Sequence, residues 1–138
     1  HLPTDPEMRV WGEHAMKGTP EAQVIEELQP ADTDFILEKR NYSSFLETGL
    51  ELLLRTLDVD TVVVTGLHTH MCCRHTAADA FQRGFKVIGV PDCMNAFTEA
   101  DHLSGLDYLE RGSCSRMDGF MIQGDDLTDH EAKHDSRR

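Results

Sequence analysis

The stretch VVVTGLHTHMCCRHTAADAFQRGFKVIGVPD, residues 62–92, decides the fold, because it holds two apolar runs around a helical segment. TVVVTG (61–66) is β-branched and almost wholly apolar, which predicts a strand buried on both faces. CRHTAADAFQRG (73–84) predicts a helix closed by Gly84, and KVIGV (86–90) predicts a second buried strand. A strand, a crossover helix and a strand in this order predict parallel pairing.

The flanking segments continue this alternation. DFILEK (34–39) predicts a short strand with a polar end, SSFLETGLELLLRTL (43–57) predicts a helix capped by a serine, and EADHLSGLDYLER (99–111) predicts a further helix. Strands separated by helices of this length predict an α/β protein with three αβα layers and a mostly parallel sheet. A chain of 138 residues suits one such domain rather than two, so residues 1–138 are predicted to form a single domain.

Composition restricts the partners and the compartment. A formal net charge of −12 argues against nucleic acid and anionic membranes, which both favour clustered Lys and Arg. The chain has no run of about 20 apolar residues and no charged-then-apolar leader segment. Its four cysteines, two of them adjacent, make no spaced disulfide framework. We therefore expect a soluble protein of the reducing cytoplasm.

The turn GLHTHMCC (66–73) is the candidate site. In parallel sheets, ligands collect at the carboxyl ends of strands, where loops lead into helix N-termini. A cysteine in the first turn of a helix is favoured as a thiolate by the unpaired backbone N–H groups and the helix dipole. The alternative is that Cys72 and Cys73 are small core residues, because unpaired cysteines are often buried.

Two blocks of residues around this turn match a known pattern. The first block is Gly66, Thr69, Cys72, Thr76, Ala77, Asp79, Ala80, Gly84 and Asp92. The upstream block is Trp11, His14, Gly18, Thr19, Glu27, Leu28, Lys39, Tyr42, Ser43, Phe45, Thr48 and Leu50. In order and spacing, the chain closely resembles the cysteine hydrolase superfamily of isochorismatases and nicotinamidases. The resemblance covers residues 1 to about 109 and implies the isochorismatase-like hydrolase fold.

The resemblance assigns catalytic roles to two residues. Cys72 matches the nucleophile that attacks the carbonyl carbon of the substrate to form a thioester. Lys39 matches the lysine beside the thiolate, where a cation lowers the pKa of the thiol and helps to hold the polarised substrate. Without the motif that follows it, Lys39 would be read as a solvated charge. Cys73 stands where the family has an apolar residue, which makes it a packed bystander.

The resemblance also implies how the substrate is held. Leu67–His68 matches a cis non-proline peptide bond, which would aim the backbone N–H groups of His68 and Cys72 at the developing oxyanion. His70 is the imidazole of the turn best suited to touch the substrate. Two further substrate-binding residues are expected, Trp11 and Tyr42. Trp11 could stack on an aromatic ring, or it could be a half-buried structural residue.

A divalent metal is a further implication of the resemblance. In nicotinamidases a metal is held beside the pocket by an Asp-x-His pair and a later His. His14 matches the later His and His1 could be the His of the pair, and imidazoles of this kind suit Zn²⁺, Fe²⁺ or Mn²⁺. The alternative is structural, because members without metal also keep a His at this position. No organic cofactor is implied.

The chain also departs from the family at both ends. The family's first strand carries an acid–base Asp, and the sequence begins at His1 without it. We therefore expect an N-terminally truncated hydrolase that has no amidase activity by itself. At the other end, GSCSR (112–116) reads as an insertion, MDGFMIQGDDL (117–127) as a weak final strand, and residues 128–138 as a disordered tail.

The resemblance implies hydrolysis of a small amide through a thioester. Trp11, with His14 and a possible His1, favours the metal-bearing branch of the family, which implies conversion of nicotinamide to nicotinate and ammonia. Within the enzymes, the alternatives are an isochorismatase-like hydrolase that acts on a vinyl ether and an amidase for another small acyl amide. Outside them, the chain would be a non-catalytic remnant that assembles with homologous subunits. The expected partners are a small-molecule substrate and further copies in a homo-oligomer, with neither nucleic acid nor membrane.

Overall fold

The structure, a computed structural model, describes residues 4–113. It falls into two compact units, His1–Arg40 and Asn41–Arg138. The single domain predicted for the whole chain remains a prediction. His1, the final strand predicted at 117–127 and the disordered tail predicted at 128–138 lie outside the described residues.

The first unit contains short helical elements joined by irregular backbone. Helix α1 (Pro6–Trp11) begins after Asp5 with a proline in its first turn, where a missing N–H costs nothing. Two 3₁₀ turns follow, Pro20–Ala22 and Glu26–Leu28. Asp5 is buried and accepts hydrogen bonds from the guanidinium of Arg40, 35 residues away. This ion pair joins the two ends of the unit.

The strand predicted at 34–39 is wrong. Residues 35–39 have no regular secondary structure, and the side chains of Phe35, Ile36 and Leu37 are exposed. A strand needs a hydrogen-bonded neighbour, and among residues 4–113 only the strands β1 and β2 pair with each other. The apolar run therefore does not become a strand from its composition alone.

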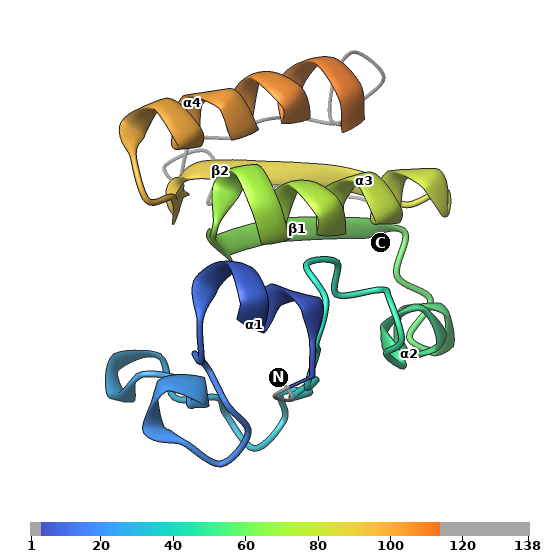
Figure 1. Ribbon diagram of the computed structural model, residues 1–138. Helices are drawn as coiled ribbons and strands as arrows, with labels where there is room; N and C mark the ends of the chain where they lie inside the picture. The colour runs from blue at the N-terminus through green and yellow to red at the C-terminus, as the bar shows by residue number, and fades with distance from the viewer. Residues whose placement is uncertain (1–3, 114–138) are drawn as a thin grey trace. The chain divides into compact units, whose positions relative to one another are not determined.

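The second unit is built on a parallel pair of strands. Strand β1 (Thr61–Leu67) pairs in parallel with β2 (Lys86–Asn95), and helix α3 (Arg74–Gln82) connects them. In Figure 1 the two strands lie side by side with α3 in front of them. The strand–helix–strand unit and the parallel sheet predicted from residues 61–90 are confirmed.

Strand β2 is longer than predicted because its pairing continues past a bulge. Val64 pairs with Gly89, but Gly66 pairs with Met94. The register therefore advances by two residues along β1 and by five residues along β2. Pro91 lies in this irregular stretch and has no N–H to donate to the ladder. Pairing then resumes to the end of the strand, where Leu67 faces Asn95.

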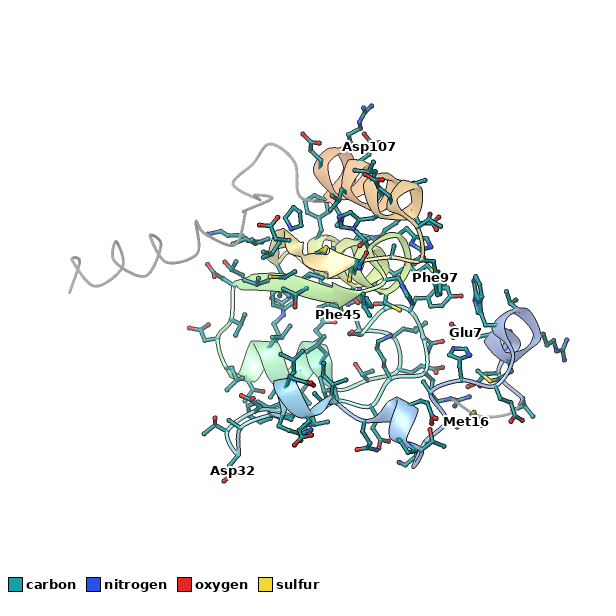
Figure 2. All side chains as sticks on the ribbon, turned by 90° about the vertical axis from the view of Figure 1, so that its left-hand side faces the viewer. Glu7, Met16, Asp32, Phe45, Phe97 and Asp107 are labelled. Carbon is teal, nitrogen blue, oxygen red and sulfur yellow. The ribbon has the colours of Figure 1, made fainter. Side chains whose placement is uncertain are left out.

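The expectation that β1 is buried on both faces is also wrong. Val64 is buried and Val62 packs against the core, whereas Val63 is 49% exposed. Successive strand residues point to opposite faces, so within residues 41–113 only one face of β1 contributes to the core. The core members are Phe45, Val64, Cys73, Ala77, Ala80, Phe85, Val87, Met94 and Leu109. Figure 2 shows Phe45 next to β1.

Helix α2 (Leu50–Thr56) begins later than the serine cap predicts. The hydroxyl of Ser43 accepts from the N–H of Phe45, and Thr48 bonds both the carbonyl of Ser44 and the N–H of Leu50. Such local bonds compete with helical ones. Glu47 also has a φ of 57°, which no α-helix accommodates. Residues 43–49 therefore form turns.

The predicted end of α3 is confirmed at Gly84. Gly84 has a φ of 83°, its N–H donates to Phe81, and the N–H of Phe85 donates to Ala80. These two bonds form a Schellman motif, which favours glycine at the left-handed position.

Among residues 4–113, the structure contains no helix whose length and apolar content would let it span a membrane.

Helix α4 (Glu99–Tyr108) confirms the last predicted helix, and a π-helical turn extends it through Leu109–Ser113. Thr98 caps it by accepting from the N–H of Asp101. Gly105 is buried against the backbone of residues 69–70, and a Cβ there would lie 2.6 Å from the nitrogen of His70. Only glycine permits this approach.

We predict that Gly105→Ala destabilises the protein by about 1–3 kcal/mol, because the added methyl group meets backbone that cannot rotate away. Urea unfolding at pH 7 measures the difference. Gly112→Ala is the control, since its Cβ would make ordinary contact with the ring of Tyr108. Equal stability of the two variants would contradict the close packing of α4.

Candidate active site

The candidate site begins where β1 ends. The peptide bond Leu67–His68 is cis, as the resemblance implied. A π-helical turn, Thr69–Cys73, follows it and runs directly into α3. Gly66, just before, has a φ of 100°, a conformation that glycine adopts without strain. The strand, the turn and the helix thus place Cys72 at the carboxyl end of β1, as predicted.

The turn is tied together by one carbonyl group. The oxygen of His68 accepts hydrogen bonds from the N–H of Met71 at 3.0 Å and from the N–H of Cys73 at 3.1 Å. The bond from Cys73 spans five residues, which defines the π-helical turn. Single π turns inside helices occur frequently at functional sites. Here the turn widens the backbone at the residue proposed as nucleophile.

The two adjacent cysteines have different surroundings. Cys73 is 3% exposed, belongs to the core, and its Sγ lies 3.5 Å from the carbonyl of Thr65. Cys72 is only partly buried. The core alternative for the pair therefore describes Cys73, and Cys72 is the more accessible thiol of the turn.

Thr69 anchors the start of the turn. Its side chain is fully buried, and its hydroxyl donates to the carbonyl of Asn95 at 3.0 Å. The same oxygen lies 2.7 Å from Nδ1 of His102 on α4. Neither Asn95 nor His102 was predicted from the sequence. The cap at Thr98 could have placed His102 in the first turn of a helix, but no local signal connects it to Thr69.

Two imidazoles lie beside the turn. The ring of His68 stacks on Phe97 at 4.0 Å, and His70 meets the same ring edge-on at 6.3 Å. Figure 2 shows Phe97 close to where β2 leads into α4. Nδ1 of both histidines is buried and has no hydrogen-bond partner among the described residues. Nε2 of His70 lies 4.0 Å from the carboxylate of Asp101.

The charge of His68 follows from these surroundings. Burial lowers the pKa of its imidazole, the charge of His70 lowers this pKa further, and Asp101 opposes both effects. Since an unperturbed histidine titrates near pH 6.5, His68 is neutral at pH 7. A neutral ring stacked on Phe97 suits a packing role for the side chain of His68. Its backbone N–H is the group that was predicted to donate to the oxyanion.

Helix α3 holds the segment that contains Tyr42. The hydroxyl of Thr76 accepts from the N–H of Ser44 at 3.1 Å and donates to the hydroxyl of the same serine at 3.3 Å. The ring of Tyr42 lies 5.5 Å from that of His75. Helix α3, which carries matched residues of the first block, is thus hydrogen-bonded to the segment 42–44, which carries the matched residues Tyr42 and Ser43 of the upstream block.

Asp79 makes the second link between α3 and this segment. Burial by itself raises the pKa of its carboxyl group, but hydrogen bonds from Ser43 and Arg83 and the charge of Arg83 outweigh burial and leave the pKa lowered. Nη1 of Arg83 lies 3.0 Å from the carboxylate. The ionised form of Asp79 therefore stabilises the fold.

The remaining predicted residues belong to the first unit. Trp11 is 49% exposed at the end of α1. Nδ1 of His14 lies 2.9 Å from the carbonyl of Gly12, and its Nε2 lies 3.8 Å from the carboxylate of Glu7. Lys39 also belongs to this unit. The predicted convergence of Lys39 and Trp11 with Cys72 stays a prediction.

The metal expectation concerns His1 and His14. Across residues 4–113, no three His, Cys, Asp or Glu side chains come together as metal ligands. His14 and Glu7 form a pair, and His1 lies outside the described residues. A catalytic metal needs about three protein ligands, so the described residues do not complete a metal site.

The model of the isochorismatase domain matches residues 1–117. The chain belongs to the isochorismatase family. The family assignment and the isochorismatase-like fold inferred from the two sequence blocks are thereby confirmed.

Several known proteins are similar to this chain. The isochorismatase of Bacillus subtilis is 34% identical over 86% of the chain and 36% of its own length. Nicotinamidase 3 of Arabidopsis thaliana is 36% identical over 78% of the chain and 55% of its own length. The chain thus spans about a third to about half of these curated relatives.

Solved structures of the family give the same fold. An isochorismatase-like hydrolase from Alkaliphilus metalliredigens superposes with a TM-score of 0.83, 35% identity, and coverage of 96% of this chain and 69% of the other. N-carbamoylsarcosine amidase from Thermoplasma acidophilum has a TM-score of 0.77 and 40% identity, with 86% and 70% coverage.

We predict that Asp79→Asn lowers the free energy of unfolding at pH 7 by about 1–3 kcal/mol, because it weakens the links to Ser43 and Arg83. A carboxylate with a lowered folded-state pKa stabilises above its unfolded pKa of about 3.9, and this contribution is lost as the pH falls through the folded value. Urea unfolding should therefore show the difference shrinking below about pH 4.

Asp107→Asn is the matched control. Asp107 pairs with Arg111 on the exposed side of α4, where a surface ion pair contributes little. A stability loss for Asp79→Asn that does not exceed that of the control would contradict the role of Asp79.

Proposed function

We propose that this isochorismatase-family chain carries the nucleophile of a hydrolase for small amides, with nicotinamide as substrate and nicotinate and ammonia as products. One observation carries the proposal. Cys72 is partly buried, in the π-helical turn that follows the cis bond Leu67–His68, while the adjacent Cys73 is enclosed in the core. The thiol at the family's nucleophile position is thus the less buried of the two.

The chemistry would proceed in two stages. The thiolate of Cys72 attacks the amide carbon, and the negative charge that develops on oxygen is held by the N–H groups of His68 and Cys72. The C–N bond then breaks, and the amide nitrogen departs as ammonia with the proton that the Cys72 thiol gave up. Water attacks the resulting thioester, which releases the carboxylic acid and regenerates the thiol.

Three residues would bind the substrate and one would assist the nucleophile. Trp11, Tyr42 and His70 are proposed to hold the ring and its substituents, and Lys39 is proposed to favour the thiolate. Their family spacing supports these roles, as does the position of His70 two residues before Cys72, beside Phe97. His1 and His14 remain the candidates for a divalent metal, to which imidazole nitrogens are suited.

A thiol nucleophile also helps to choose between substrates. The relatives include an isochorismatase as well as nicotinamidases, so the vinyl ether of isochorismate is the second candidate. A vinyl ether offers no acyl carbon for a thiolate to attack, whereas an amide does. The position of Cys72 therefore favours the amide, and parallel assays with nicotinamide and isochorismate test this choice.

In the full gene product, we predict that Cys72→Ala abolishes ammonia release from nicotinamide, since no thioester can form. Cys73→Ala should keep most of the activity, because Cys73 is enclosed in the core and contributes packing. A coupled ammonia assay on both variants measures this. Equal losses in the two variants would sink the assignment, and turnover of isochorismate but not nicotinamide would support the second candidate.

We further predict that Lys39→Met slows alkylation of Cys72 by iodoacetamide at pH 7, because a nearby cation no longer favours the thiolate. Fragment-ion mass spectrometry separates modification of Cys72 from that of Cys73. Lys17→Met is the matched control, since Lys17 pairs with Glu38 on the exposed surface of the same unit. An unchanged rate for Lys39→Met would mean that Lys39 acts elsewhere.

A further inference from the structure

The buried hydroxyl of Thr69 connects three elements of the second unit. Thr69 is the first residue of the π-helical turn and has no exposed surface. Its Oγ1 reaches the carbonyl of Asn95, at the end of β2, at 3.0 Å. The same atom reaches Nδ1 of His102, in the first half of α4, at 2.7 Å. A single side chain therefore ties the turn to the strand and to the helix.

The direction of these bonds fixes the proton on His102. A hydroxyl has one proton, and a carbonyl oxygen can only accept, so the proton of Thr69 points at Asn95. The contact with His102 must then be a bond that Nδ1–H donates to the hydroxyl oxygen. Both the neutral ring with its proton on Nδ1 and the imidazolium can make this bond.

The packing around His102 keeps it facing the turn. Gly105 lies three residues further along α4, and residues three apart share a helix face. That face is pressed against the backbone of residues 69–70, where a Cβ on Gly105 would come within 2.7 Å of the carbonyl carbon of Thr69. At the start of the helix, the hydroxyl of Thr98 accepts a hydrogen bond from the N–H of Asp101, the residue directly before His102.

We propose that His102 is a positioning residue, which holds the hydroxyl of Thr69 and through it the turn that presents Cys72. This inference rests on the proposed function, in which Cys72 is the nucleophile. His102 contacts the first residue of the turn, three residues before Cys72. Without it, the buried hydroxyl loses its donor, and the N–H groups of the turn lose their fixed direction.

The first test is the tautomer of His102, which does not depend on catalysis. Long-range ¹H–¹⁵N NMR of the labelled protein at pH 7–8 should show His102 as the Nδ1–H form. Free neutral histidine in water favours the Nε2–H form instead. Detection of Nε2–H with an unprotonated Nδ1 would overturn the proposal, because Nδ1 could not then donate to Thr69.

The second test compares two substitutions at the same position. His102→Leu fills space without a donor, whereas the side-chain amide of His102→Asn can place an N–H near the position of Nδ1. In the full gene product, kcat for ammonia release should fall by about 10–100-fold in His102→Leu with little change in KM, since misplaced groups at a site cost rate of this order. His102→Asn should recover most of the loss.

A control variant on α4 and the activity of Cys72→Ala distinguish the role of His102 from the role of Cys72. Leu103→Ala, on an exposed part of α4, should leave kcat unchanged. Equal impairment of His102→Leu and His102→Asn would reduce His102 to packing and overturn its role. If Cys72→Ala retains full activity, the proposed function fails while the tautomer result still stands. If the protein turns over no amide, the iodoacetamide rate at Cys72 replaces kcat, and an unchanged rate in His102→Leu overturns the inference.

Discussion

The hydrogen bonds of the buried Thr69 hydroxyl are the contacts on which the rest of the second unit depends. A hydroxyl without exposed surface is costly unless it is bonded, so its partners, Asn95 and His102, have to be in place. Asn95 reaches it because β2 pairs again with β1 beyond the bulge at Pro91. The irregular register of the sheet is thus a condition for the ordered turn that contains Cys72.

Helix α3 fixes the other side of the site through polar side chains. Thr76 and Asp79 hold Ser44 and Ser43, although these residues lie more than 30 positions apart in the chain. Residues 43–44, which adjoin the matched residues Tyr42 and Phe45, therefore meet helix α3 as hydrogen-bonded partners. The matched residues Ser43, Thr76 and Asp79 thus have a structural role in this joint.

The sequence was sufficient where local chemistry determines the structure. Strand β1, helix α3 and its end at Gly84 follow from apolar period and a left-handed glycine, and the cis bond at Leu67–His68 follows from the family motif. It was insufficient in two places. Residues 35–39 have no pairing strand among residues 4–113, because pairing depends on distant segments, and the local hydroxyl bonds of Ser43 and Thr48 make α2 begin later than the apolar spacing predicts. The contact of His102 was not predictable from local sequence, because its partner Thr69 lies 33 residues away.

The close docking of α4 has a consequence for cooperativity. Gly105 lies against the backbone of residues 69–70, and His102 contacts the side chain of Thr69. Helix α4 therefore cannot separate from the sheet without breaking the bonds that order the turn. Partial opening of proteins proceeds in such linked segments. The amide protons of helix α4 and of the turn should therefore exchange with solvent together. A molecule that binds the outer face of α4 would then change the order of the turn that contains Cys72 without contacting Cys72.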